Sequence, residues 1–215
     1  MTAVARGFFI TFEGGEGAGK STQVKRLADR LRALGRGVVT TREPGGSLGA
    51  EAIRDLLVRG EAERWSSITE TLLMYAARRD HIERTIEPAL ERGDVVVCDR
   101  FFDSTRAYQG AGGGAPMALI GALEAEVVGA VVPDLTLIFD LPVAEGLARA
   151  AARGEGEARF ESKGQAFHER LREAYLAIAR REPERCVIVD AVGDLASVEA
   201  RVWAAVGARL EPANG

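Results

Sequence analysis

Cysteine and long apolar runs are scarce in this sequence of 215 residues. Its two cysteines, Cys98 in DVVVCDR and Cys186 in RCVIVDA, form no CxxC spacing. We therefore expect two buried free thiols rather than metal ligands or redox groups. No apolar run approaches the ~20 residues that span a bilayer, and the N-terminus lacks a basic stretch followed by an apolar one. These absences predict a cytoplasmic protein with no membrane partner.

An excess of positive charge is also missing, since the net charge is -4. The charge predicts no general attraction to nucleic acid, so a bound anion would have to be held by a local cluster of arginines. A composition of 47% hydrophobic and 28% charged residues excludes disordered and fibrous classes. Because no repeat or linker interrupts the chain, we expect a single domain over residues 1–215.

Short apolar runs alternate with longer helical patterns. The runs predict strands at residues 8–13, 37–43, 94–99, 135–140 and 186–191. Several are apolar almost throughout, which is typical of strands covered on both faces. Helical patterns occupy residues 21–35, ending at Gly35, and residues 66–93. This alternation predicts an α/β three-layer sandwich with parallel strands. The glycine-rich stretch at 110–114 is expected to be a solvated loop.

One motif carries specific chemistry. Gly14 to Ser21 read GGEGAGKS, which matches G-x-x-x-x-G-K-[ST] directly after a predicted strand and before a predicted helix. In such a loop, successive backbone N–H groups and the helix dipole hold a polyphosphate. Lys20 would reach the β- and γ-phosphates, and the Ser21 hydroxyl would coordinate Mg²⁺. The residues predicted to bind ATP are Gly14, Gly15, Glu16, Gly17, Ala18, Gly19, Lys20, Ser21 and Thr22.

Other features distinguish among the classes of protein that use this loop. Asn214 is the only asparagine, so the Asn-Lys-x-Asp element that GTPases use for guanine is absent. The apolar strands end in Asp99-Arg100 and Asp140-Leu141 rather than in the Asp-Glu of motor ATPases. A carboxylate beside the magnesium and an arginine that can grip a second phosphate instead favour phosphoryl transfer between nucleotides.

The motifs together resemble one family, the bacterial thymidylate kinases. They run in order along nearly the whole chain: FITFEGGEGAGKST, TREPGGSLG, IRDLL, LLMYAARRDHI, DRFFDSTRAYQG, PDLTLIFDL, RGEGEARFE and FHERLREAYL. The resemblance implies a P-loop kinase fold with a five-stranded parallel sheet and a homodimer. It also implies an enzyme that transfers the γ-phosphoryl group of magnesium-ATP to dTMP and so serves dTTP biosynthesis.

The resemblance assigns roles around the acceptor phosphate. Glu16 would accept a hydrogen bond from the 3′-hydroxyl of dTMP. Arg54, Arg78 and Arg100 would surround the monophosphate and base, because a dianion in a partly buried crevice needs bidentate cationic partners. Asp99 would help to order the magnesium ligands, together with Ser21.

The same resemblance places the base and sugar of dTMP. Thr105 and Gln109 would offer hydrogen-bonding groups near thymine, and Tyr108 would crowd the 2′ position of a ribose. The turn at Glu43 and Pro44 would form a wall beside the acceptor phosphate. Where the family commonly has a phenylalanine stacked on thymine, this chain has Met74, a softer platform, and Tyr75 is an alternative partner for the base.

A helical lid segment is expected at about residues 149–164. The resemblance implies that lid arginines approach the transferring phosphoryl group, because the loop carries Gly17 where some relatives have an arginine. We expect Arg153 and Arg159 to do so, with Arg149 in a structural role. The residues expected to act in catalysis are Lys20, Asp99, Arg100, Arg153 and Arg159.

Two alternatives remain. A kinase of a related nucleoside or nucleoside monophosphate would share this loop, although the three acceptor arginines favour a phosphorylated substrate. A regulatory module that binds nucleotide without turnover is the other alternative. The presence of Lys20, Ser21 and Asp99 counts against it, and an ADP-release assay distinguishes the two.

Overall fold

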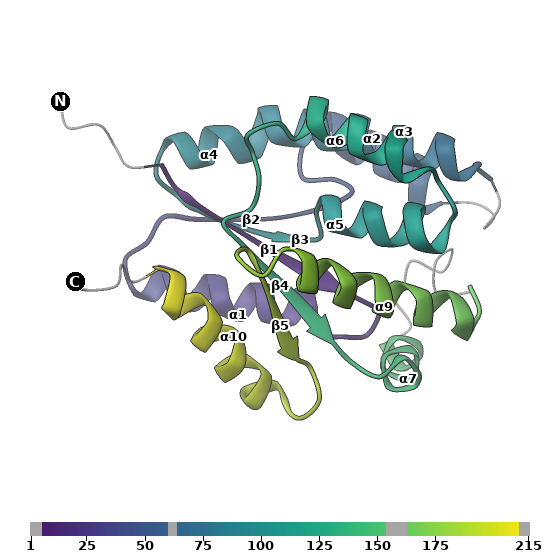
Figure 1. Ribbon diagram of the computed structural model, residues 1–215. Helices are drawn as coiled ribbons and strands as arrows, with labels where there is room; N and C mark the ends of the chain where they lie inside the picture. The colour runs from purple at the N-terminus through teal and green to yellow at the C-terminus, as the bar shows by residue number, and fades with distance from the viewer. Residues whose placement is uncertain (1–5, 60–63, 154–162, 211–215) are drawn as a thin grey trace.

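A parallel β-sheet forms the middle layer of the protein (Figure 1). The computed structural model describes residues 6–59, 64–153 and 163–210. The strand order is β2-β3-β1-β4-β5, and all four pairings are parallel. The strands are β1 Phe8–Gly14, β2 Val38–Arg42, β3 Val95–Asp99, β4 Leu135–Asp140 and β5 Cys186–Asp190. The prediction of a five-stranded parallel α/β fold is confirmed.

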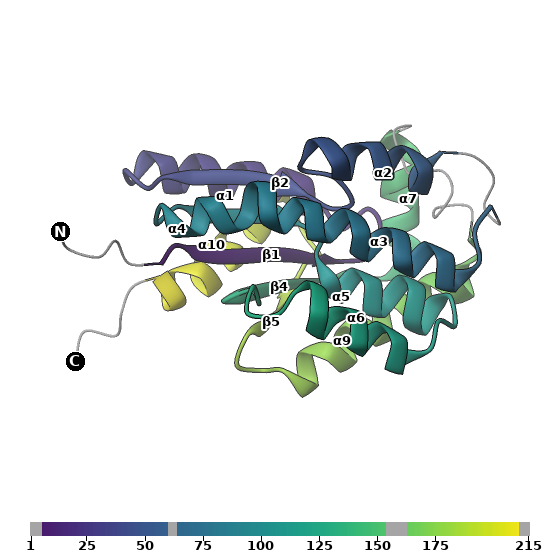
Figure 2. The ribbon, with the colours of Figure 1, turned by 90° about the horizontal axis from the view of Figure 1, so that it is seen from above.

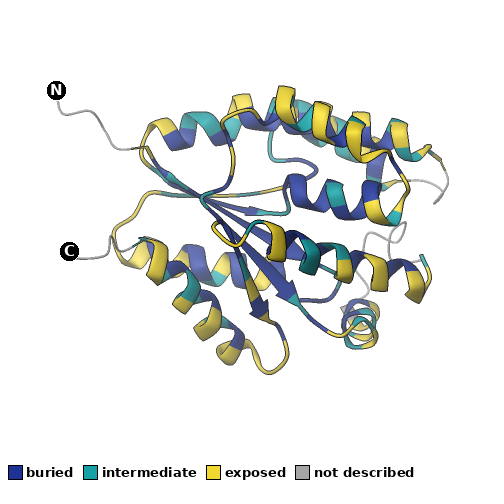
Figure 3. Cartoon of the chain, in the orientation of Figure 1, coloured by how far each residue is buried: buried dark blue, intermediate teal, exposed yellow. Residues whose placement is uncertain are grey.

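Helices cover both faces of this sheet. They and the π-helical turns (η) are α1 Lys20–Ala33, α2 Leu48–Val58, α3 Ser67–His81, η1 Ile82–Ile86, α4 Glu87–Glu91, α5 Phe102–Thr105, η2 Arg106–Gly112, α6 Met117–Val127, α7 Val143–Arg153, α9 Gln165–Arg181 and α10 Leu195–Leu210. Helices α1 and α10 lie on one face, and α3, α4, α5 and α9 lie on the other (Figure 1). Figure 3 shows the buried residues gathered on the sheet and on the inner faces of these helices.

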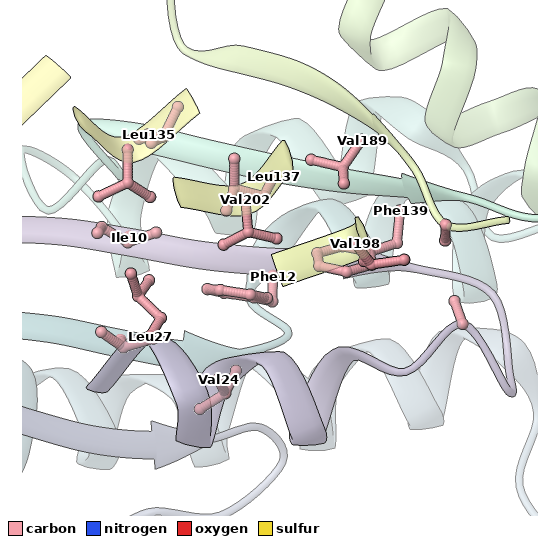
Figure 4. Packing of buried hydrophobic residues seen from close by; sticks show 14 of the residues in the cluster. Ile10, Phe12, Val24, Leu27, Leu135, Leu137, Phe139, Val189, Val198 and Val202 are labelled. Atoms are coloured by element: carbon pink, nitrogen blue, oxygen red, sulfur yellow. The ribbon is translucent and has the colours of Figure 1, made fainter. Parts of the chain in front are cut away.

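The core has one apolar layer on each side of the sheet. Under α1 and α10, Phe12 and Phe139 stack with ring centroids 5.4 Å apart, beside Val24 and Val198 (Figure 4). On the other face, residues of β1 and β3 such as Phe9 pack against α3, η1 and α4. The strands are apolar almost throughout because both of their faces are covered in this way.

The helix ends follow local signals. Helix α1 ends before Gly35, whose φ of 78° is the left-handed conformation that glycine adopts at little cost. Ser66 caps α3 by accepting a hydrogen bond from the Thr69 N–H at 3.2 Å. Helices α3 and α4 are in line (Figure 2) and are joined by the π-helical turn η1. Pro88 has no N–H to donate to the preceding turn, which accounts for the irregular winding there.

The prediction for the glycine-rich stretch at 110–114 is wrong in its first half. The π-helical turn η2 continues through Gly112, and only Gly113 and Gly114 lie outside it. A Cβ added at Gly112 would lie 2.6 Å from the ring of Phe167. Gly112 therefore allows η2 to pack closely against α9, a long-range contact with no local sequence signal.

The remaining expectations concern the thiols and the membrane. Cys98 and Cys186 are both free and buried, as predicted. Burial raises the pKa of Cys186 to about 12, so this thiol is not reactive near neutral pH. Within the described ranges, no helix is long and apolar enough to cross a bilayer.

Candidate active site

The glycine-rich loop lies between the carboxyl end of β1 and the start of α1. Gly14, Gly17 and Gly19 have φ values of 132°, 69° and 84°. A Cβ at Gly17 would lie 1.9 Å from the carbonyl oxygen of Gly146 in α7. The loop therefore needs glycine both for its backbone conformation and for its close approach to α7. Within the loop and the first turn of α1, Ala18 is buried, whereas Ser21 and Thr22 are exposed.

Lys20 is buried at the mouth of this loop. Its Nζ donates hydrogen bonds to the carbonyl oxygens of Gly14 at 3.0 Å and Gly15 at 2.8 Å. Burial lowers the pKa of Lys20 to about 8, and the positive charge of Arg100 acts in the same direction. The ammonium group is still mostly charged at neutral pH, so it gives the loop a fixed positive charge.

A hydroxyl and a carboxylate meet beside the loop. Ser21 Oγ, in the first turn of α1, donates to Asp99 Oδ2 at the end of β3, 2.5 Å away. Among the described residues no cluster of three or more histidine, cysteine or acidic side chains could hold a metal by itself. Mg²⁺ is commonly bound through one or two protein oxygens together with substrate phosphates and waters, and this pair of oxygens fits that pattern.

Arg100 follows β3 in a strained conformation. Its φ of 71° is in the left-handed region, the only such value for a non-glycine residue in the described chain. Its N–H donates to Phe12 O at 2.9 Å, and its carbonyl oxygen accepts from Cys98 Sγ at 3.0 Å. Strain of this kind persists only where the surroundings fix the backbone, and it is often found at functional sites.

The Arg100 side chain joins the loop to the next element. Its Nη1 donates to Gly14 O at 3.0 Å, and its Nη2 donates to Glu16 Oε1 at 2.9 Å. Tyr108 OH, from η2, donates to the same carboxylate oxygen at 2.6 Å. Burial opposes ionisation of Glu16, but Arg100 and Lys20 outweigh it and lower the pKa of Glu16 to about 2. Glu16 is therefore an ionised hydrogen-bond acceptor near neutral pH.

A pocket of about 340 Å³ opens beside Arg100. Its lining residues are Glu43, Pro44, Met74, Arg78, Arg100, Phe101, Ser104, Thr105 and Tyr108. Arg78 is buried and donates through Nε to Glu43 Oε2 at 2.8 Å and through Nη2 to Thr105 Oγ1 at 3.1 Å. Its Nη1 is also buried, and no hydrogen-bond partner for this atom lies within the described part of the chain. Arg78 thus lines the pocket and keeps one donor without a partner among the described residues, which is unusual for a buried polar atom.

Four residues that the sequence analysis names for the substrate differ in their relation to this pocket. Met74 lines the pocket, whereas Tyr75 is buried in the apolar core next to β3 and does not line it. Arg54 donates to Pro44 O at 2.7 Å, so it holds the turn that forms one wall; the Glu43-Pro44 peptide bond is cis. Gln109 is buried outside the lining and donates to Glu70 Oε1 at 2.7 Å.

The predicted lid is described only in part. Arg149, in α7, donates to Ala191 O at 3.4 Å and to Glu145 one helical turn away. These contacts agree with the structural role expected for Arg149. Arg153 is the last residue of α7, and its side chain, like Arg159, lies outside the described residues.

Two residues of this region, Glu13 and His81, were not predicted from the sequence to take part in the site. Glu13, in β1, accepts hydrogen bonds from Phe101 and Ser104, and burial next to Asp103 raises the pKa of Glu13 to about 7. His81 is buried between Thr41 and Glu43, with 2.7 Å and 3.0 Å separations. A charged residue within an apolar strand was the available signal for Glu13. For His81 there was none, because its partners are distant in the sequence.

Comparisons with known proteins agree with this geometry. The family model described as "Thymidylate kinase" matches residues 12–202. A thymidylate kinase of Caulobacter vibrioides is 69% identical over 96% of this chain and 99% of its own length. One from Pseudomonas fluorescens is 56% identical over 97% of this chain and 99% of its own length. The crystal structure of thymidylate kinase from Ehrlichia chaffeensis is 36% identical, with a TM-score of 0.76 over 94% of this chain and 99% of that one. The chain belongs to the thymidylate kinase family.

Proposed function

We propose that this chain transfers the γ-phosphoryl group of ATP to dTMP, giving dTDP and ADP, as a single kinase domain of the dTTP-forming route. Membership in a family of enzymes named thymidylate kinases supports the reaction. The observation that carries the proposal is that one oxygen, Gly14 O, accepts from both Lys20 Nζ and Arg100 Nη1 at 3.0 Å. The loop lysine and the pocket arginine thus meet where a phosphoryl group would pass between two nucleotides.

The donor nucleotide would be held by the glycine-rich loop. Backbone N–H groups of residues 14–19 and the N-terminus of α1 suit the β- and γ-phosphates of ATP. Lys20 would move from the loop carbonyls to these phosphates. Ser21 and Asp99 would hold Mg²⁺, which when bound to the phosphates neutralises part of their charge.

The acceptor would occupy the pocket beside Arg100. Arg78 and Arg100 line the pocket and supply positive charge, and Arg54 would act beside them through the Pro44 turn. Glu16, ionised and bonded to Tyr108, would accept a hydrogen bond from the 3′-hydroxyl of dTMP. The arginines require a substrate that already carries a phosphate, and Glu16 requires one that carries a sugar hydroxyl.

The base would lie against Met74, within reach of the polar groups on α5 and η2. Thr105 lines the pocket, and the buried Oε1 of Gln109 has no hydrogen-bond partner among the described residues. Tyr108 donates to Glu16, and this fixed hydroxyl supports the proposed role of the ring, which would crowd a ribose 2′-hydroxyl. Filling an already packed pocket with an extra group costs ~1–3 kcal/mol.

The chemistry needs no strong general base. An oxygen of the acceptor phosphate attacks the γ-phosphorus, the bond to the β–γ bridging oxygen breaks, and ADP leaves with that oxygen. The attacking oxygen is already anionic near neutral pH, so positioning and charge neutralisation carry the rate. Lys20 and Arg100 would supply that charge, and Arg153 and Arg159 would add to it.

The proposed enzyme is a cytoplasmic homodimer. Exposed apolar side chains on two neighbouring helices support self-association: Ile68 and Leu72 on α3 are 46% and 47% exposed, and Met117 on α6 is 51% exposed. Helices α3 and α6 pack against one another, so these side chains belong to one region of the surface. Apolar surface that is grouped in this way commonly marks a protein interface.

The test is a coupled ADP-release assay with magnesium-ATP and a panel of acceptors: dTMP, dUMP, UMP, dCMP, dGMP and thymidine. We expect turnover to be strongest with dTMP and absent with thymidine. Lys20→Ala and Arg100→Ala should abolish it, and Arg36→Ala, an exposed arginine between α1 and β2, is the matched control. A different best acceptor would contradict the pocket assignment. ATP binding without turnover on any acceptor would favour a regulatory module.

A further inference from the structure

Glu13 is a fully buried carboxyl group next to the glycine-rich loop, and the proposed reaction does not use it. It lies in β1, one residue before Gly14. Its Oε1 accepts hydrogen bonds from the N–H groups of Phe101 at 2.8 Å and Ser104 at 3.3 Å. Its Oε2 accepts from Ser104 Oγ at 2.5 Å. Burying an acidic group costs free energy, so these contacts need an explanation beyond packing.

Glu13 caps a helix from another element. Phe101 is the N-cap residue of α5, and its side chain makes no capping hydrogen bond. The Ser104 N–H, at N3, is one that an N-cap side chain normally satisfies, and the Phe101 N–H is the one that an N3 side chain satisfies in a capping box. Glu13 accepts both of them from the neighbouring strand. It thereby fixes the start of the helical segment that continues into η2, which carries Thr105 and Tyr108 of the pocket.

The contacts of Glu13 also extend to Arg100. Ser104 Oγ lies 3.3 Å from Arg100 Nη1 and 2.9 Å from Tyr175 OH. Above its pKa of about 7, Glu13 is ionised and can only accept hydrogen bonds, so the Ser104 hydroxyl donates its hydrogen bond to Glu13. The lone pairs of Ser104 then face Arg100, which can only donate. The charge of Glu13 thus orients Ser104 as an acceptor for the pocket arginine.

We propose that Glu13 is a positioning residue for the acceptor side of the reaction, acting through Ser104 to hold Arg100 against Gly14 and Glu16. This inference rests on the proposed function. Glu13 touches neither proposed substrate, so its effect is indirect. It sets the direction of the arginine that would meet the acceptor phosphate, and it leaves the backbone groups of the donor loop unchanged.

An isosteric substitution separates this role from simple packing. In Glu13→Gln the carbonyl oxygen can still accept from the backbone N–H groups, but the amide N–H₂ faces Ser104 as a second donor. Ser104 then has to accept from the amide and loses its orientation toward Arg100. Ser104→Ala removes the same link and keeps the Glu13 carboxyl group with its two backbone donors, so it tests the inference even if the Glu13 variant does not fold.

The experiment measures steady-state kinetics for both substrates at about pH 8, above the pKa of about 7 to which burial raises Glu13. We expect kcat/KM for dTMP to fall about tenfold to a hundredfold in Glu13→Gln, the range for a hydrogen bond to a charged group. The KM for ATP should change less than about twofold. Ser104→Ala should show the same selective loss, and the double variant should be no worse than either single one. Glu184→Gln, an exposed glutamate, is the matched control.

The wild-type protein is assayed with dTMP first. Absence of wild-type turnover would overturn the proposed function, and the inference with it. If the wild type is active and both variants keep kcat/KM for dTMP within about twofold, the inference alone is wrong. An equal loss for ATP and dTMP, in parallel with a lower Tm, would also overturn it, because it would assign Glu13 a purely structural role.

Discussion

Replacement of Glu16 by glutamine should lower the free energy of unfolding by about 3 kcal/mol at pH 7. The carboxylate is 15% exposed and bonded to Arg100 at 2.9 Å, and its pKa is lowered from 4.5 to about 2. Lowering the pKa from 4.5 in the unfolded chain to about 2 in the folded protein corresponds to about 3 kcal/mol at a pH where Glu16 is ionised in both states. The glutamine carbonyl can still accept from Tyr108 and Arg100, so the substitution removes mainly the charge.

The stabilisation by Glu16 should depend on pH in one direction only. Because the folded pKa of Glu16 lies below the unfolded value, the stabilisation is present above pH 4.5 and is lost as the pH falls toward 2. Urea denaturation of the wild type and Glu16→Gln should therefore show a difference that shrinks through this window. The control variant is Glu173→Gln. It breaks the ion pair with Arg180, and the Glu173 side chain is 68% exposed. That change should cost less than about 1 kcal/mol. A Glu16→Gln difference below that value at pH 7, or one that persists in acid, would refute the reasoning.

Three further predictions concern the loop, the base and the surface. Gly17→Ala, at φ 69° and 1.9 Å from a carbonyl oxygen of α7, should lower the free energy of unfolding by more than about 1–2 kcal/mol, measured by denaturation. Gly121→Ala, in open space on α6, should raise it by about 0.5–1 kcal/mol, and equal effects would contradict the steric argument. Met74→Phe should raise the dTMP-to-dUMP ratio of kcat/KM by about two- to tenfold through ring stacking, and an unchanged ratio would remove Met74 from the base site. Leu72→Glu should shift the protein to monomer in sedimentation experiments. The control Leu34→Glu, on the exposed end of α1, should not. A dimer that survives Leu72→Glu would place the interface elsewhere.

The strands and the phosphate loop could be predicted from the sequence because their signals are local. An apolar run such as VVVCD identifies β3 whatever surrounds it, and the spacing of Gly14, Gly19 and Lys20 identifies the loop. The glycines at 110–112 could not be assigned correctly. The close packing of Gly112 in η2 depends on Phe167, more than fifty residues later in the chain.

The candidate site divides in the same way. Glu16, Arg100 and the pocket residues follow from motifs, and the structure brings Glu16 and Arg100 to 2.9 Å. Their supporting contacts could not be predicted, because they join distant parts of the chain. Glu13 meets Ser104 across 91 positions, and that pairing depends on the register of β1 and β3. Periodicity identifies a strand, but it does not identify the side chain that the strand will face.

The most direct test of the central claim is to follow labelled γ-phosphate from ATP in the presence of dTMP, with the wild type and Arg100→Ala. The account predicts that the wild type places the label on dTMP, forming dTDP with little inorganic phosphate. Arg100→Ala should bind ATP normally but transfer almost no label, because Arg100 joins the pocket to the loop through Gly14. Label released mainly as inorganic phosphate, or transfer that does not depend on Arg100, would contradict the account.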